Sequence, residues 1–220
     1  MDQHNETFET WNKVAQLYQE KFMDRDVYNA TYDYFCDRVA AANASVLELG
    51  CGPGNVTKYL LSKRPGFRLH GIDYSPNMVA LARSNNPTAQ FSVMDCRSLT
   101  EVTGSYDGII CSFCAPYLSQ MEIQKLVSDC CGLLNQGGHI YISFVEGDPS
   151  DSGFRAASTG DRTYFYYHTT VFMEELMVKL GFEPPTVFKI PYPAAEENKE
   201  LHIVLIARKG AEPVGLGVKS

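Results

Sequence analysis

The stretch Ser45-Val-Leu-Glu-Leu49, followed directly by Gly50-Cys-Gly-Pro-Gly54, decides how this chain folds. A short, mainly apolar run that ends in a turn rich in glycine is typical of a β-strand leading into a helix. The glycines permit positive φ angles and let a ligand approach the backbone closely. Because the next helix would offer free N–H groups at its start, this turn is a candidate nucleotide-binding site.

Two common nucleotide motifs do not match the turn. The dinucleotide fingerprint G-x-G-x-x-G requires a third glycine, which falls at Asn55 when counted from Gly50 and at Thr57 when counted from Gly52. A phosphate-binding P-loop ends in Gly-Lys-Ser or Gly-Lys-Thr, and that ending is absent. The turn therefore favours a nucleotide-like ligand that is neither a dinucleotide nor a nucleoside triphosphate.

The rest of the chain predicts a layered α/β fold. Apolar residues at three- and four-residue spacing predict helices over 7–22 and 27–42. Further strands are expected at 67–72, 89–94, 106–111 and 139–144, alternating with helices at 55–63, 76–84 and 119–134. Strands and helices that alternate at this spacing indicate βαβ units and a parallel sheet.

The last third of the chain has a different pattern. Residues 146–163 are rich in Gly, Asp, Ser and Thr and are expected to form a loop. A helix over 171–180 and strands at 187–190 and 201–207 follow, and the short connection between these strands predicts an antiparallel hairpin. We expect a helical cap over 1–42, a ligand-binding domain over 43–209 and a frayed tail over 210–220.

Composition restricts the class of protein. The net charge of −7 disfavours nucleic acid as a partner, and no apolar run approaches the roughly 20 residues that span a bilayer. The polar N-terminus does not resemble a secretory signal, and seven cysteines, several in apolar runs, indicate reduced thiols in a cytoplasmic protein. Cys111 and Cys114 form a C-x-x-C pair, but the context of a redox or zinc site is missing, so we expect no metal.

Three carboxylates lie near the predicted strand ends. Asp73 follows the second strand, where it is positioned to accept hydrogen bonds from ribose hydroxyls, and Asp95 follows the third, near an adenine edge. Either residue could instead cap the next helix. Glu48 lies inside an apolar strand, where a buried carboxylate requires hydrogen-bond donors.

Four ordered motifs resemble those of class I S-adenosylmethionine (AdoMet)-dependent methyltransferases, in particular the small-molecule branch with a helical cap. They are residues 46–54, residues 71–78, Asp95 and residues 106–110. The resemblance implies a doubly wound, seven-stranded, mostly parallel sheet of order 3-2-1-4-5-7-6 with strand 7 antiparallel. It also implies AdoMet as cofactor and these cofactor-binding residues: Tyr18, Glu48, Gly50, Cys51, Gly52, Asp73, Tyr74, Met78, Asp95, Cys96, Ser112 and Phe113.

The acceptor side is less defined. Many members of this family have a histidine after the fourth strand, where this chain has Ala115-Pro-Tyr117-Leu. Candidate general bases are therefore His168, Tyr117 and Tyr167, although the pattern favours His168 as a surface residue that hydrogen-bonds the next helix. The other strand histidines, His202 among them, are expected in the core or at a sheet edge. The aromatic run 164–167 and the N-terminal helices suggest a pocket for a small methyl acceptor. The alternative function is an AdoMet- or adenosylhomocysteine-binding sensor without transfer activity, and the oligomeric state is not predicted.

Overall fold

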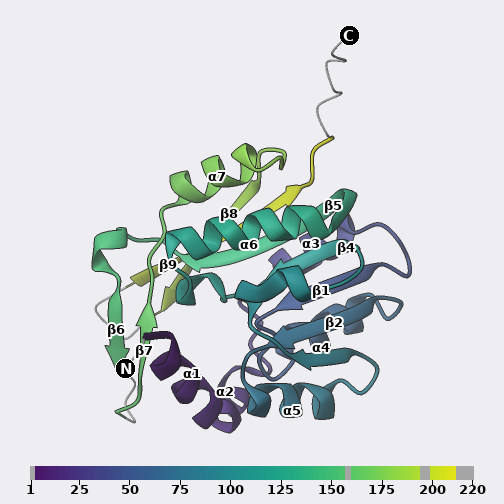
Figure 1. The fold of residues 1–220 in the computed structure, drawn as a ribbon. Coiled ribbons are helices and arrows are strands. Elements are labelled where there is room, and N and C mark those ends of the chain that lie inside the picture. Colours follow the sequence, from purple (N-terminus) through teal and green to yellow (C-terminus); the bar gives the residue numbers. More distant parts are fainter. Residues whose placement is uncertain (1–2, 157–159, 194–198, 212–220) are drawn as a thin grey trace.

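Seven strands form the central sheet in the order β3-β2-β1-β4-β5-β9-β8 (Figure 1). This computed structural model describes residues 3–156, 160–193 and 199–211. The strands are β1 Ser45–Leu49, β2 Arg68–Asp73, β3 Gln90–Val93, β4 Tyr106–Cys111, β5 Leu134–Val145, β8 Thr186–Pro193 and β9 Lys199–Arg208. The first five run parallel, whereas β9 is antiparallel to both β5 and β8. The predicted fold class and strand order are confirmed.

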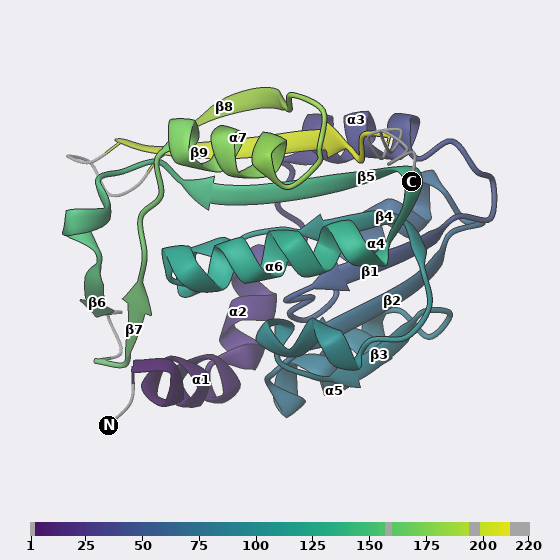
Figure 2. The same ribbon diagram turned by 45° about the horizontal axis from the view of Figure 1, so that its top comes forward.

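Helices cover both faces of the sheet (Figure 2). On one face, α3 (Asn29–Arg38) and α4 (Asn55–Lys63) bury a core with Val46, Ile110 and Tyr141. On the other face, α6 (Gln120–Leu133) and α7 (Thr170–Lys179) cover Leu47, Ile109 and Ile140. Neighbouring residues of one strand thus contribute to opposite cores, as the alternation of side chains along a strand requires.

The crossover helices begin where the sequence predicts. Ser75 caps α5 (Pro76–Asn85), since its hydroxyl accepts a hydrogen bond from the Met78 N–H, and Pro76 occupies the first turn. Ser119 and Glu122 form a reciprocal capping box at the start of α6. These caps place the residues that precede each helix at the carboxyl edge of the sheet, where ligands bind in open α/β folds.

The N-terminal cap differs in detail from the prediction. The expected helix 7–22 is two helices, α1 (Gln3–Lys13) and α2 (Ala15–Phe22), because Val14 leaves helical geometry at φ −93° and ψ 12°. The helix expected over 27–42 is shorter, because α3 ends at Arg38. The break at Val14 lets α1 turn away toward β7 while α2 stays beside α5 (Figure 1).

The loop expected over 146–163 was wrong in part. It contains a 3₁₀ turn, η3 (Pro149–Asp151), and the strand β6 (Gly153–Ala156), which pairs with β7 (Arg162–Phe165) in a two-stranded hairpin. This hairpin packs against α1, where the Tyr164 N–H donates to Thr7 Oγ1 at 2.9 Å and Thr10 Oγ1 donates to the Arg162 carbonyl at 2.8 Å. The composition gave no indication of this hairpin, because the partner that orders it lies about 150 residues away in the sequence.

Residues 212–220, most of the predicted tail, lie outside the described residues. Within the described ranges, no helix combines the length and the apolar character that crossing a bilayer requires. The same ranges contain no group of three or more His, Cys, Asp or Glu side chains suited to holding a metal ion.

Candidate functional site

The glycine-rich turn has the backbone that the sequence predicts. Gly50 has φ +66° and Gly54, at the start of α4, has φ +82°, both in the left-handed region that favours glycine. A Cβ atom on Gly50 would lie 3.0 Å from Cβ of Cys114, and one on Gly54 would collide with the Asn86 side chain. The turn therefore needs glycine both for its conformation and for its packing.

Asp73 ties the turn to the end of β2. Its Oδ2 accepts from the Gly52 N–H at 2.9 Å, and its Oδ1 accepts from the Ser75 N–H at 2.8 Å. Burial raises the pKa of this carboxyl, while the two backbone donors act in the opposite direction. Each carboxylate oxygen has a second lone pair, so Asp73 retains the capacity to accept bonds from a ligand.

Glu48 is the most deeply buried carboxyl of the site. Its side chain, 1% exposed, accepts a hydrogen bond from the Thr57 hydroxyl on α4. Burial raises the pKa of Glu48 to about 8, so the carboxyl is largely protonated at neutral pH. A neutral acid needs fewer donors than a carboxylate, which explains how this residue is tolerated in an apolar strand.

A first cavity of about 140 Å³, the cofactor-side cavity, lies at the carboxyl ends of β1 to β4. Ten of the twelve predicted cofactor residues line it: Tyr18, Gly50, Gly52, Asp73, Tyr74, Met78, Asp95, Cys96, Ser112 and Phe113. The structure thus brings these residues together from five separate segments of the chain. Sequence reasoning missed other lining residues, notably His4 and Arg97.

The two remaining cofactor residues are placed differently. Glu48 lines the neighbouring cavity described below. Cys51 lines neither cavity: it is 1% exposed, packs with Val79, Ala82 and Phe91, and donates its N–H to the Ile72 carbonyl at 2.9 Å. The side chain and the N–H group of Cys51 are thus used in packing the turn, and the expected contact of the backbone around Cys51 with the cofactor stays a prediction.

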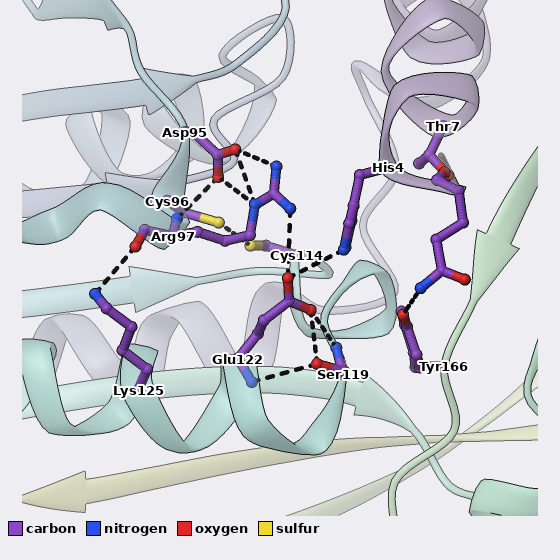
Figure 3. A network of polar contacts seen from close by, with 11 residues as sticks. His4, Thr7, Asp95, Cys96, Arg97, Cys114, Ser119, Glu122, Lys125 and Tyr166 are labelled. Atoms are coloured by element: carbon purple, nitrogen blue, oxygen red, sulfur yellow. Dashed lines mark hydrogen bonds and ion pairs between the residues drawn. The ribbon is translucent and has the colours of Figure 1, made fainter. Parts of the chain in front are cut away.

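Asp95 belongs to a polar network that joins the cavity to the N-terminal helix (Figure 3). The Arg97 guanidinium holds Asp95 at 2.5 Å and contacts Glu122 on α6 at 3.3 Å, and His4 of α1 lies 3.0 Å from the same Glu122 oxygen. Burial raises the pKa of Asp95, but the Arg97 guanidinium outweighs this and holds the pKa below its ordinary value. Asp95 is thus an ionised acceptor at the cavity wall, anchored by Arg97 rather than free.

A second cavity of about 480 Å³ adjoins the first, and it is called the acceptor-side cavity after the methyl acceptor that the sequence predicts. The two cavities share a wall formed by Trp11, Tyr18, Gly50, Gly52, Ser112, Phe113 and Tyr117. Phe113 has φ +58° and is the only non-glycine residue with positive φ in the part of the chain that the structure describes. Its N–H donates to the buried Ser143 hydroxyl at 2.8 Å, so the strained backbone is held in place between the two cavities.

The predicted bases have different environments. Tyr117 lines both cavities between Trp11 and Phe165, but burial raises its pKa well above the ordinary value, so it remains protonated. The prediction for His168 is not supported, because this fully buried residue lines neither cavity. Its Nε2 lies 3.2 Å and 3.1 Å from the carbonyl oxygens of Ala115 and Leu118, so the histidine fastens the segment after β4. Tyr167 likewise lies outside both cavity walls and is bonded to Arg155.

Sequence reasoning also missed residues of the acceptor-side cavity. Tyr28, Tyr192, Glu200 and His202 line it, although His202 was expected to be a core or edge residue. A signal was present: Glu200 and His202 are polar residues two apart, directly before the apolar run 203–207 of β9, so both lie on one face. The sequence did not reveal which loops approach that face of β9.

Comparison with known proteins agrees with this geometry. Residues 46–138 match a family model described as a methyltransferase domain. The putative methyltransferase 235L of Invertebrate iridescent virus 6 is 25% identical over 136 residues, 62% of this chain and 49% of the relative. The trans-aconitate 2-methyltransferase of Methylobacterium nodulans is 46% identical over 89 residues, 40% of this chain and 33% of the relative. The chain therefore spans half or less of the length of these two curated relatives.

The fold also matches a solved structure. The complex of DhpI with SAH has a TM-score of 0.74 at 16% identity, covering 96% of this chain and 98% of that one. At this level of identity the match supports the shared fold alone.

Proposed function

Because the chain belongs to the class I AdoMet-dependent methyltransferase family, we propose that it binds AdoMet and transfers its methyl group to a small-molecule acceptor. The observation that carries this proposal is the convergence of the glycine-rich turn, Asp73 and Asp95 on one cavity at the carboxyl edge of the sheet.

The cofactor-side cavity has the chemistry that AdoMet requires. Asp73, at the end of β2, suits the ribose hydroxyls, and the open backbone at Gly50 and Gly52 suits the methionine portion. The indole N–H of Trp11 is buried and has no hydrogen-bond partner among the residues that the structure describes, and Trp11 lines both cavities. Since a buried donor without a partner is costly, a ligand with an acceptor at this point would be stabilised by it.

The acceptor-side cavity supports a small acceptor rather than a macromolecule. Aromatic side chains dominate its wall: Trp11, Tyr18, Phe22, Tyr28, Tyr32, Tyr59, Phe113, Tyr117, Phe165 and Tyr192. The volume of about 480 Å³ suits a metabolite-sized molecule. The net charge of −7 disfavours a nucleic acid as the acceptor.

AdoMet supplies an activated methyl group on a sulfonium, so the protein's task is to position the acceptor and to exclude water. Phe113 and Tyr117 stand in the shared wall and would orient the acceptor toward the cofactor side. The α1 helix, fixed by His4 to Glu122 and by Thr7 and Thr10 to β7, would close the site against solvent.

Binding of the cofactor can be measured directly. Trp11 is the only tryptophan in the chain, so its emission should change when AdoMet or adenosylhomocysteine binds, and calorimetry gives the affinity. Replacing Asp73 by alanine strands two backbone donors and removes the proposed ribose acceptor, so AdoMet should bind about 1–3 kcal/mol more weakly.

Asp107→Ala is the matched control. Asp107 also accepts a backbone N–H, from Ser45 at 2.9 Å, but it lies at the opposite edge of the sheet, near the start of β4. Asp107→Ala should therefore lose stability while AdoMet affinity stays unchanged. Absence of binding by the wild-type protein at millimolar AdoMet would refute the proposal. Methyl transfer to metabolites is detected by the mass of the products. AdoMet binding without transfer to any metabolite would favour the sensor function instead.

We also propose that the protein works in a reducing compartment, the cytoplasm. All seven cysteines are free thiols in the structure, and five of them are buried. Thiol titration of the protein from fresh lysate should recover seven reactive thiols after denaturation, and fewer would contradict this localisation.

A further inference from the structure

Three side chains form a connected chain of polar contacts in the wall of the acceptor-side cavity. The Tyr28 hydroxyl lies 2.5 Å from Nδ1 of His202, and Nε2 of the same ring lies 3.4 Å from Oε2 of Glu200. All three residues line the cavity. A phenol at the cavity is thereby linked through an imidazole to a carboxylate.

Several elements of the fold position these three side chains. Glu200 and His202 project from the same face of β9, and Tyr28 immediately precedes α3 on that face of the sheet. Tyr192 of β8 stacks on the His202 ring at 4.4 Å, and Phe113 lies 4.9 Å from both the Tyr28 and the His202 rings. The three side chains therefore adjoin Phe113, the residue that stands between the acceptor-side and the cofactor-side cavities.

The charges around Glu200 determine which atom donates and which accepts in each hydrogen bond of the three side chains. Glu200 is ion-paired with Arg155 of β6 at 2.9 Å, and the hydrogen bond from His202 lowers the pKa of Glu200, so this carboxyl is ionised. An ionised Glu200 accepts from Nε2–H, which leaves Nδ1 free to accept the Tyr28 hydroxyl proton. The other polar group facing the ring is Tyr192, whose hydroxyl is bonded to Arg25.

We propose that Tyr28, His202 and Glu200 form a proton relay that deprotonates the methyl acceptor. Tyr28 is the catalytic residue that touches the acceptor, and Glu200 is a positioning residue that fixes the imidazole tautomer. The acceptor is then a compound whose nucleophilic oxygen or nitrogen carries a proton. This inference rests on the proposed methyltransferase function.

The step balances without a further reactant. The acceptor oxygen or nitrogen gives its proton to the Tyr28 oxygen while the Tyr28 hydroxyl proton passes to Nδ1 of His202. The electron pair released on the acceptor forms the new bond to the methyl carbon, and the sulfonium sulfur retains the pair of the broken bond. The resulting imidazolium is paired with Glu200 and then loses its proton to solvent. Burial raises the pKa of Tyr28, which keeps the phenol protonated between turnovers.

The tautomer can be tested by nitrogen NMR of the labelled protein bound to adenosylhomocysteine. The proposal expects His202 with Nδ1 unprotonated and Nε2 protonated, and Glu200→Gln should produce a mixture of both tautomers. A neutral His202 protonated at Nδ1 in the wild-type complex would overturn the relay, whatever acceptor is used. Failure of adenosylhomocysteine and AdoMet to bind at all would instead refute the proposed function.

Measurement of methyl-transfer activity provides a second test of the relay. A panel of small phenols, alcohols, N–H heterocycles, carboxylates and tertiary amines is incubated with AdoMet, and products are detected by mass. Tyr28→Phe should lower kcat/KM by about 100-fold for an O–H or N–H acceptor, the scale of general-base catalysis, with AdoMet affinity unchanged. Tyr34→Phe is the control, because this tyrosine on α3 bonds to Thr186 at 3.0 Å and lines neither cavity. Methylation confined to carboxylates or tertiary amines, or equal activity of Tyr28→Phe and wild type, would overturn the relay.

Discussion

Replacing Glu48 by glutamine should stabilise this protein at neutral pH and change how its stability depends on pH. The side chain is 1% exposed on β1 and is bonded to the Thr57 hydroxyl. Glutamine has nearly the same shape and presents an oxygen to Thr57, but it carries no ionisable group. The substitution therefore removes the cost of ionising a buried carboxyl while keeping the packing.

The magnitude follows from the pKa. Burial raises the pKa of Glu48 from 4.5 to about 8, so the folded state keeps a proton that the unfolded state loses above the ordinary value. With the unfolded state binding fewer protons, the free energy of unfolding falls as pH rises between these two values. Each pH unit in that window corresponds to at most about 1.4 kcal/mol, and the unfolded glutamate is only partly ionised at about pH 5, so raising the pH from about 5 to about 7 should destabilise wild type by about 2.5 kcal/mol relative to Glu48→Gln.

Urea unfolding followed by Trp11 emission measures this difference. Wild type and Glu48→Gln are unfolded at a series of pH values across the window, and the difference between their unfolding free energies is plotted against pH. Glu101→Gln, at an exposed position at the end of the 3₁₀ helix Cys96–Glu101, controls for the loss of one carboxyl group.

A constant difference between wild type and Glu48→Gln across the window would refute the reasoning. It would mean that Glu48 ionises in the folded state as it does in the unfolded chain. A difference that grows toward low pH would reverse the sign and point to an ionised, paired carboxylate at this position.

Two further predictions concern the architecture that surrounds the site. Gly54→Ala should cost about 3 kcal/mol, because it combines left-handed backbone strain with a collision at Asn86, whereas Gly104→Ala, at φ +96° with open space around it, should cost only about 1–2 kcal/mol. Urea unfolding of both variants separates backbone strain from collision, and equal losses would contradict the packing argument. His168→Leu should cost about 1–3 kcal/mol, because the Leu118 carbonyl loses its ring donor, whereas the Ala115 carbonyl keeps the hydrogen bond from the Leu118 N–H. Burial lowers the pKa of His168, so the unfolded state binds more protons and wild type should lose stability as pH falls below about 6.5. His168→Leu should show less of that loss in thermal melts at different pH, and a steeper loss would count against the burial argument.

The local features of the site could be read from the sequence because each depends on neighbouring residues. Positive φ at Gly50 and Gly54 follows from the lack of a side chain, and the start of α5 follows from Ser75 and Pro76. Asp73 could be placed because the end of a strand is set by its own pattern. The order of the strands was implied by the resemblance of these motifs to a family, whereas the antiparallel pairing of β9 with β8 already followed from their short connection.

Only the tertiary structure decided which side chains line the second cavity, the proposed acceptor site. Tyr28 and His202 are 174 residues apart, and they meet because the antiparallel β9 inserts between β5 and β8 on the face that α3 covers. The same limit explains the misplacement of His168, whose carbonyl partners lie on a segment about 50 residues earlier. Periodicity along the chain specifies which face a residue occupies, but it carries no information about what packs against that face. The hydrogen bonds and buried contacts that settle this form only when distant segments are brought together.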